Sequence, residues 1–224
     1  MSSTALFAGS FGPLLTTLMD NAAAAGEAVA CADTQASTAS WKSDRLHVPW
    51  SPRSPLSARS LTSACVNACG TVDRAVLVIA PARCGASLVD AGISEIERYL
   101  DDELRSVVYL SRELLRHLSA YTPTTEAGPT AGSLIIAVAE PEDAVGESMR
   151  SLVYGAVGAF LSTLLDHYRE SGPPVYGFIG PDSEEQAGAY ASFIETECRE
   201  RAGRIRGRLQ RYGKRTALRS LFRS

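Results

Sequence analysis

This chain of 224 residues lacks an apolar segment long enough to span a membrane, a cluster of metal ligands and an even number of cysteines. No apolar run reaches the roughly 20 residues that a membrane-spanning helix needs, and no basic segment precedes an apolar one at the start, so we expect neither a membrane span nor a signal peptide. The three histidines lie far apart, and Cys65 and Cys69 have no further ligands at a recognisable spacing, so no metal site is predicted. Five scattered cysteines favour reduced thiols and a cytoplasmic location.

Charge is divided unevenly between the body and the end of the chain. Residues 199–224 hold nine arginines and one lysine against a single acid, whereas the first 198 residues carry 12 bases and 24 acids. We expect this tail to dock on an acidic protein partner, with the chain's own acidic body as another candidate and nucleic acid or a membrane surface less favoured. A basic amphipathic helix is predicted by arginines at helical spacing, namely Arg201, Arg204, Arg208, Arg211 and Arg215.

The start of the chain alternates apolar runs with a helical segment. The run at residues 4–8 leads into a glycine-containing loop at 9–12, and a helix is predicted from Pro13 to about residue 25, with proline where its missing N–H costs nothing. A second apolar run at 28–32 predicts another buried strand. The sequence therefore opens with a β-α-β unit, and its 45% hydrophobic content suits an α/β domain.

The same alternation continues along the chain. Further strands are predicted at 46–50, 73–80, 132–139 and 175–179, and helices at 57–70, 93–118 and 150–170. Nearly all-apolar strands are typical of a parallel sheet with helices on both faces, so we predict a three-layer Rossmann-like α/β fold with a mostly parallel sheet. The polar loop from Glu140 to Ser148 follows a strand at the end of the sheet where ligands bind in such folds.

Tyr154 lies near the start of the helix after this loop and carries a family resemblance. The layout resembles the core of a short-chain dehydrogenase/reductase, a family with a serine after the strand and a Tyr-x-x-x-Lys motif on the helix. Here Gly158 stands at the lysine position, and Ala139, or Glu140 if the alignment slips by one residue, stands at the serine position. The family's asparagine, which kinks the preceding long helix, corresponds to Glu103. The resemblance implies the fold and argues against the family's usual reaction.

The loop after the first strand resembles the family's nucleotide-binding turn, which has three glycines. Counted from Gly9, the second and third glycine positions hold Pro13 and Leu15, and Gly12 lies one residue from the second, so the loop is either one residue short or has lost a glycine. Such glycines allow close backbone approach to a pyrophosphate, and proline removes an amide donor. The resemblance therefore implies weak or absent NAD(P) binding. The candidate cofactor residues are Gly9, Ser10, Phe11, Gly12 and Asp33, the last in the place of the acid that holds a ribose hydroxyl.

Two further stretches bear on a cofactor. Trp50 stands roughly where the family's residues touch the adenine and could stack on a base, although a tryptophan there is more often part of the core. Residues 79–82, Ile-Ala-Pro-Ala, replace the family's polar Asn-Asn-Ala-Gly. This replacement keeps the strand and removes polar contacts to a dinucleotide.

Tyr154 is the candidate catalytic residue, and it is the only one of the family's four catalytic positions that this chain retains. A tyrosine titrates near pKa 10, so on the order of 0.1% is phenolate at neutral pH unless a neighbouring cation stabilises the anion. Gly158 supplies no cation, and the acids of the preceding loop, Glu140, Glu142, Asp143 and Glu147, would raise the pKa of the phenol. Arg83 and Arg150 are the nearest cations in the sequence, and nothing in the sequence says that they point inward.

We therefore predict a pseudoenzyme, a non-catalytic subunit or regulatory partner that acts by homo- or hetero-oligomerisation through the helices at 93–118 and 150–170. The alternatives are a divergent NAD(P)H-dependent oxidoreductase that uses Tyr154, and an adaptor that binds RNA or a membrane through its tail. The resemblance spans about residues 4–181. We accordingly predict a Rossmann-like domain over residues 1–181 and a helical, arginine-rich extension over residues 182–224.

Overall fold

The computed structural model describes residues 3–33, 40–42, 45–83, 89–120, 132–140 and 148–213. Within them, one eight-stranded sheet has the strand order β3-β4-β2-β1-β5-β6-β7-β8, and all neighbouring strands are parallel except the antiparallel edge pair β3 and β4. The strands are β1 (Thr4–Gly9), β2 (Ala28–Asp33), β3 (Ser40–Lys42), β4 (Arg45–Pro49), β5 (Arg74–Ile79), β6 (Ser133–Glu140), β7 (Val175–Pro181) and β8 (Leu209–Arg211).

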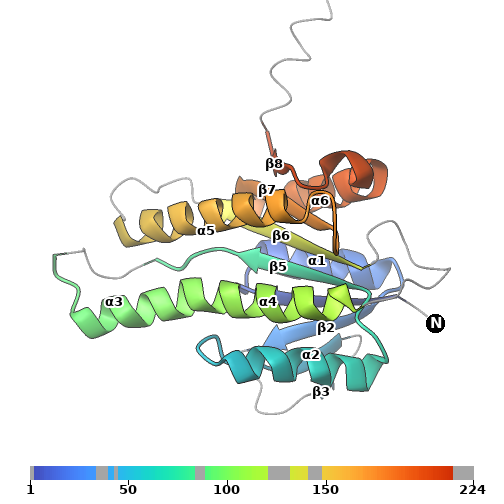
Figure 1. Cartoon of the computed structure of the whole chain (residues 1–224), viewed down its shortest axis with the longest axis horizontal. Helices are drawn as coiled ribbons and strands as arrows, with labels where there is room; N and C mark the ends of the chain where they lie inside the picture. The colour runs from blue at the N-terminus through green and yellow to red at the C-terminus, as the bar shows by residue number, and fades with distance from the viewer. Residues whose placement is uncertain are drawn as a thin grey trace, which may run out of the picture.

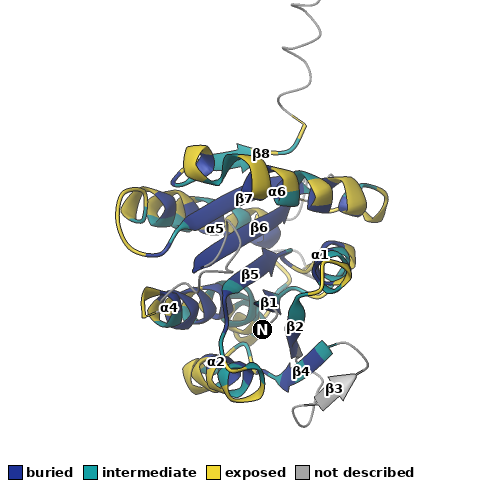
Figure 2. Ribbon diagram, turned by 90° about the vertical axis from the view of Figure 1, so that its right-hand side faces the viewer, coloured by how far each residue is buried: buried dark blue, intermediate teal, exposed yellow. Residues whose placement is uncertain are grey.

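Helices cover both faces of the sheet, which gives three layers (Figure 1 and Figure 2). One face carries α2, α4 and α5, and the other carries α1 and α6. A single long helical segment runs through α3, a π-helical turn η1, and α4. The helices are α1 (Pro13–Ala24), α2 (Pro55–Cys69), α3 (Ile93–Leu100), η1 (Asp101–Arg105), α4 (Ser106–Ser119), α5 (Ser148–His167) and α6 (Glu184–Ile205).

The central strands are buried on both faces, and their alternate residues enter two separate cores. In β6, Leu134, Ile136 and Val138 pack under α4 and α5, while Ile135 and Ala137 pack under α1 and α6. A strand of this kind needs apolar side chains at every position, because successive side chains point to opposite faces. The predicted three-layer Rossmann-like fold with a mostly parallel sheet is therefore confirmed.

The end of the described chain differs from the predicted helical tail. The basic helix was expected to continue to Arg215, but α6 ends at Ile205 and residues 209–211 form β8, which pairs in parallel with β7. Gly207 follows the helix with φ +68°, a left-handed conformation that glycine adopts readily, and a Cβ atom there would overlap Arg169. Residues 214–224 of the predicted tail lie outside the described residues.

Three of the tail's arginines bond within the chain. Arg211 pairs with Glu140 at 3.3 Å, Arg201 pairs with Glu197 at 2.7 Å, and Arg206 donates to the carbonyl oxygens of Tyr168 and Gly172. Of these contacts, only the Arg211–Glu140 pair joins the tail to an acid of the body, since Arg201 and Glu197 lie on the same helix and Arg206 bonds to backbone carbonyls. These contacts concern residues 199–213 only, and docking on another molecule stays a prediction.

The helix α5 contradicts the expectation that no apolar segment is long enough to span a membrane. Among the described residues it is the single helix long and apolar enough to cross a membrane by length and composition, whereas the sequence was expected to contain no such segment. Val153, Val157, Leu161 and Leu165 bury one face of this helix against the sheet. A core helix of this kind satisfies the same criterion, so the finding is weak evidence for a membrane span.

Candidate functional site

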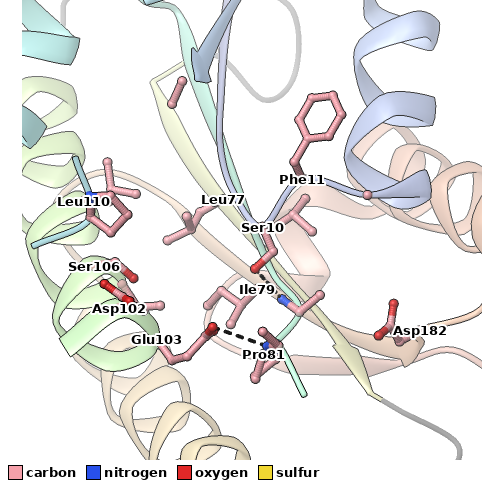
Figure 3. A pocket seen from close by; sticks show the side chains of 18 of the residues that line it. Ser10, Phe11, Leu77, Ile79, Pro81, Asp102, Glu103, Ser106, Leu110 and Asp182 are labelled. Atoms are coloured by element: carbon pink, nitrogen blue, oxygen red, sulfur yellow. Dashed lines mark hydrogen bonds between the residues drawn. The ribbon is translucent and has the colours of Figure 1, made fainter. Parts of the chain in front are cut away.

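A cavity of about 830 Å³ opens at the carboxyl ends of β1 and β5, between the β1–α1 loop and the long α3–η1–α4 helix (Figure 3). The strand order reverses at this point, since the chain turns from β1 to β2 on one side and to β5 on the other. Crevices at such switch points are where α/β sheets bind their ligands. We take this cavity as the candidate functional site.

The β1–α1 loop forms one wall, and four predicted cofactor residues, Gly9 to Gly12, line it. Gly9 has φ +109°, and a Cβ atom there would overlap the carbonyl of Val78 in β5, so this position requires glycine. The loop is fastened to β5, because the amide of Ser10 donates to the Val78 carbonyl at 2.8 Å and the Ala80 amide donates to the Ser10 hydroxyl at 3.0 Å. The dashed line from Ser10 in Figure 3 marks this second bond.

Gly12 and Phe11 face the open part of the site. Gly12 caps α1 in an extended conformation, and a Cβ atom added to it would meet no atom within 4 Å. Phe11 is 73% exposed at the mouth of the cavity. Pro13 begins α1, and the amides of the next residues belong to a first helical turn that has no intrahelical acceptors. Asp33, the fifth predicted cofactor residue, ends β2, and its side chain lies outside the described residues.

A second wall comes from β2 and β4. Trp50, which follows β4, is 7% exposed and lines the cavity together with Ala32 and His47. Trp50 also belongs to the core beneath α2 and α4, which is one of the two roles weighed for it, and its stacking on a base stays a prediction. Across the mouth, Arg53 makes a two-bond ion pair with Asp102 of η1, with distances of 2.5 and 2.8 Å, which links the β4–α2 loop to the long helix.

Glu103 lies on the π-helical turn at the site predicted to kink the long helix. The turn brings its carboxylate toward the loop after β5, where it accepts a 3.3 Å hydrogen bond from the Ala82 amide (Figure 3). Burial raises the pKa of Glu103, and the neighbouring Asp102 adds to the effect while the Ala82 bond and Arg150 oppose it. π-helical turns are frequent at functional sites.

Arg150 is the functional-site residue that the sequence did not place. It lies in the first turn of α5, is 5% exposed, and lines the cavity. Its Nε donates to the Pro81 carbonyl at 2.9 Å and a terminal nitrogen donates to the Asp182 carboxylate at 3.1 Å. Because Pro81 follows β5 and Asp182 follows β7, one guanidinium joins two strand ends that flank β6. In the sequence, the only indication that Arg150 belongs to the site was its position close to Tyr154.

Tyr154 is not among the residues that line this cavity. Its phenol donates a hydrogen bond to the backbone carbonyl of Ala139, the residue at the family's serine position. Burial raises the pKa of Tyr154 above its ordinary value of 10.0, the negative charges of Glu140 and Asp182 raise it further, and Arg150 and Arg211 only partly oppose them. The phenol is therefore a poor proton donor in this setting.

The described residues show no alternative metal chemistry. Among them, no three His, Cys, Asp or Glu side chains gather closely enough to hold a metal ion. Cys65 is buried, which raises the pKa of its thiol to about 12, and a neutral thiol is a poor metal ligand. Cys69 lies one turn further along α2.

Comparison with solved structures assigns the fold. A short-chain dehydrogenase/reductase of the glucose/ribitol dehydrogenase type from Brucella melitensis is 13% identical, with 93% of this chain and 94% of that chain covered and a TM-score of 0.72. The 3-ketoacyl-(acyl-carrier-protein) reductase of Brucella melitensis, complexed with NADH, is 15% identical, with 94% and 96% covered and a TM-score of 0.71. The fold is that of the short-chain dehydrogenase/reductases.

An NADH-dependent reductase complexed with NAD is a further neighbour, 13% identical, with 94% of each chain covered and a TM-score of 0.70. These likenesses reach beyond the residues 4–181 over which the sequence resembled the family. The sequence itself matches no protein-family model and no curated protein. At such low identity the short-chain dehydrogenase/reductase likeness concerns the fold, and the activity must be argued from the side chains.

Proposed function

We propose that this chain is a non-catalytic protein with the short-chain dehydrogenase/reductase fold, and that it acts by pairing with a second copy of itself. The non-catalytic part of this proposal rests on the hydrogen bond from Tyr154 to the Ala139 carbonyl. In the family's reaction this tyrosine would donate its proton to a substrate oxygen. Here the proton is directed to the backbone, and no lysine follows at position 158 to lower the pKa of the phenol.

The second half of the proposal rests on the outer surface of α4 and α5, successive helices of one layer (Figure 1). Val108 of α4 is 46% exposed and Leu152 of α5 is 54% exposed. Between the buried positions of α5, the exposed residues Gly155, Ala156 and Ala159 are small. A glycine inside a helix costs about 1 kcal/mol relative to alanine, and the chain itself leaves room for a Cβ atom at Gly155. Close approach of another helix would account for small residues at these positions.

Charge along the α3–η1–α4 helix favours a second copy as the partner. The first half is acidic: besides Asp102, which pairs with Arg53, and Glu103, which faces the Ala82 amide, it contains Glu95, Glu97 and Asp101, with one arginine. The second half carries Arg105, Arg112 and Arg116, with one buried acid. In a two-fold pair the two helices run antiparallel, so the acidic half of each faces the basic half of the other. The same helix laid parallel on its copy would place like charges together.

Light scattering after size-exclusion chromatography tests the pairing. The wild-type chain of 23.8 kDa should elute with twice that mass, and the double variant Val108→Glu/Leu152→Glu should elute as a folded monomer. Leu56→Glu is the matched control, because Leu56 is 72% exposed on α2 and belongs to neither α4 nor α5, so it should leave the dimer intact. A wild-type monomer at high concentration would contradict self-pairing, and a complex formed only with a different chain would replace the homodimer by a heteromer.

A divergent NAD(P)H-dependent oxidoreductase is the second candidate. Its support is the cavity at the switch point together with neighbours of the same fold whose structures contain NADH or NAD. The test is consumption of NADH and NADPH with a panel of aldehydes and ketones. We expect wild-type rates equal to those of Tyr154→Phe, and a wild-type rate that this variant abolishes would establish the enzyme instead.

A further inference from the structure

The guanidinium of Arg150 occupies the carboxyl end of β6. It bonds the carbonyl of Pro81 on one side and the carboxylate of Asp182 on the other. Adjacent strands lie about 4.8 Å apart, so the ends of β5 and β7 are separated by roughly 10 Å with β6 between them. A single side chain that reaches both of these ends must lie over the end of β6.

This place matters because a dinucleotide lies across the switch point, with one half on each side of it. The half nearest the glycine loop and β2 carries the adenosine and the phosphates. The other half, which carries the nicotinamide, would lie toward the ends of β5, β6 and β7. The Arg150 bridge forms the wall of the cavity on this second side, together with Pro81 and Asp182. On the first side the cavity is lined by Gly12, Ala32 and Trp50, and a Cβ atom at Gly12 would meet no atom within 4 Å.

We propose that Arg150 closes the nicotinamide half of the cavity, so that the site accepts an adenosine diphosphate group and excludes an intact dinucleotide. The inference rests on the proposed function, since a chain that transfers no hydride has no need to seat a nicotinamide. It deepens that function by naming the chemical class of ligand that the cavity binds.

The bonds of Arg150 give the physical reason for the exclusion. To admit a nicotinamide ring the guanidinium would have to leave both partners at once. It is buried, so it would lose charge-assisted hydrogen bonds without gaining full contact with water, and the carboxylate of Asp182 would lose its cation. An adenosine diphosphate ends before this region and leaves the bridge intact.

Two variants separate the bridge from the rest of the site. Arg150→Ala removes the guanidinium, and Asp182→Asn weakens its anchor while keeping the size of the side chain. Gly12→Asp is the matched control for the open half, because its carboxylate would enter free space beside the expected phosphates and repel any ligand that carries them. Circular dichroism and thermal unfolding establish that each variant is folded.

Isothermal titration of the full-length chain with ADP, ADP-ribose, NAD⁺ and NADH tests the proposal. In the wild type, we expect ADP and ADP-ribose to bind at least tenfold more tightly than NAD⁺ and NADH. Arg150→Ala should bind the dinucleotides about tenfold more tightly than the wild type, with little change in the affinity for ADP. In Asp182→Asn the affinity for the dinucleotides should rise by less. Gly12→Asp should weaken all four ligands.

Either of two results would overturn the inference: no binding of ADP at millimolar concentration, or wild-type binding of NADH tighter than that of ADP-ribose. Tight NADH binding without substrate reduction would leave the proposed function standing and remove only this inference. Substrate reduction that requires Tyr154 would remove the proposed function, whatever the order of the affinities.

Discussion

The phenol of Tyr154 donates its hydrogen bond to the carbonyl of Ala139, so the tyrosine of α5 is fastened to the end of β6. The two residues stand at the positions of the family's proton donor and of the serine that would hold the substrate oxygen. Alanine in place of serine offers no hydroxyl, and the phenol donates to the backbone carbonyl of this residue. A residue of catalytic type thereby has a structural role.

Tyr154→Phe should destabilise the protein modestly and change no activity. The substitution removes one hydrogen bond and leaves the carbonyl of Ala139, which is buried, without that donor, which costs about 1 kcal/mol. Urea unfolding followed by circular dichroism measures the change. Destabilisation near zero would mean that the bond to Ala139 does not form in solution.

Gly158→Lys should lower the pKa of Tyr154, because residues four apart on a helix lie on the same face and a cation stabilises the phenolate. A Cβ atom at Gly158 meets no atom within 4 Å, so the chain has room for the side chain. Thr163→Lys is the control, since Thr163 is exposed on α5 and lies more than two helical turns from Tyr154. Phenolate absorbance across an alkaline pH series should show a lower tyrosine pKa for Gly158→Lys and no change for the control. Equal titration curves for the two variants would contradict the placement of Tyr154.

Gly9→Ala should destabilise the protein by about 3 kcal/mol or more, because a Cβ atom there collides with backbone and the φ of +109° is strained for alanine. Gly12→Ala, three residues later in the same loop, has open space and an extended backbone, so its stability should change little. Thermal unfolding of both variants compares them directly. Equal stabilities would show that the loop does not pack against β5 as described.

Glu103→Gln should stabilise the protein at neutral pH and not at acid pH. The folded-state pKa of Glu103 is raised above 4.5, chiefly by burial, so the unfolded chain loses the proton first and the free energy of unfolding falls as the pH rises from 4.5 through the raised pKa. Glutamine stays uncharged and keeps an acceptor for the Ala82 amide. The gain in melting temperature should therefore vanish below pH 4.5.

The central strands were predicted from the sequence because they are buried on both faces and are therefore apolar throughout. Residues 132–139, which correspond to β6, are an example. The two strands that it did not predict, β3 and β8, have three residues each and lie at the sheet edges. Leu209 to Arg211 form a strand only because β7 lies beside them, and arginines at helical spacing predicted a helix instead. Pairing between distant segments leaves no local pattern in so short a strand.

The glycine loop and Tyr154 were identified from the sequence, but their relation to the cavity was not. Motif positions place Tyr154 near the end of β6, and the direction of its phenol depends on which acceptor is available there. Arg150 illustrates the same limit. Its partners, Pro81 and Asp182, are 69 and 32 residues away in the chain, so only the folded sheet brings the three together.

The titration of Tyr154 in the wild-type protein tests the central claim most directly. Carbon-13 NMR of the tyrosine ring carbon that bears the hydroxyl follows each phenol separately, and Tyr154→Phe identifies the relevant signal. We predict that the Tyr154 signal remains that of the neutral phenol beyond pH 10.0, since burial and the nearby carboxylates raise its pKa. A titration midpoint below 10.0, shifted toward neutral pH, would show a phenol prepared for proton transfer and would contradict the non-catalytic account.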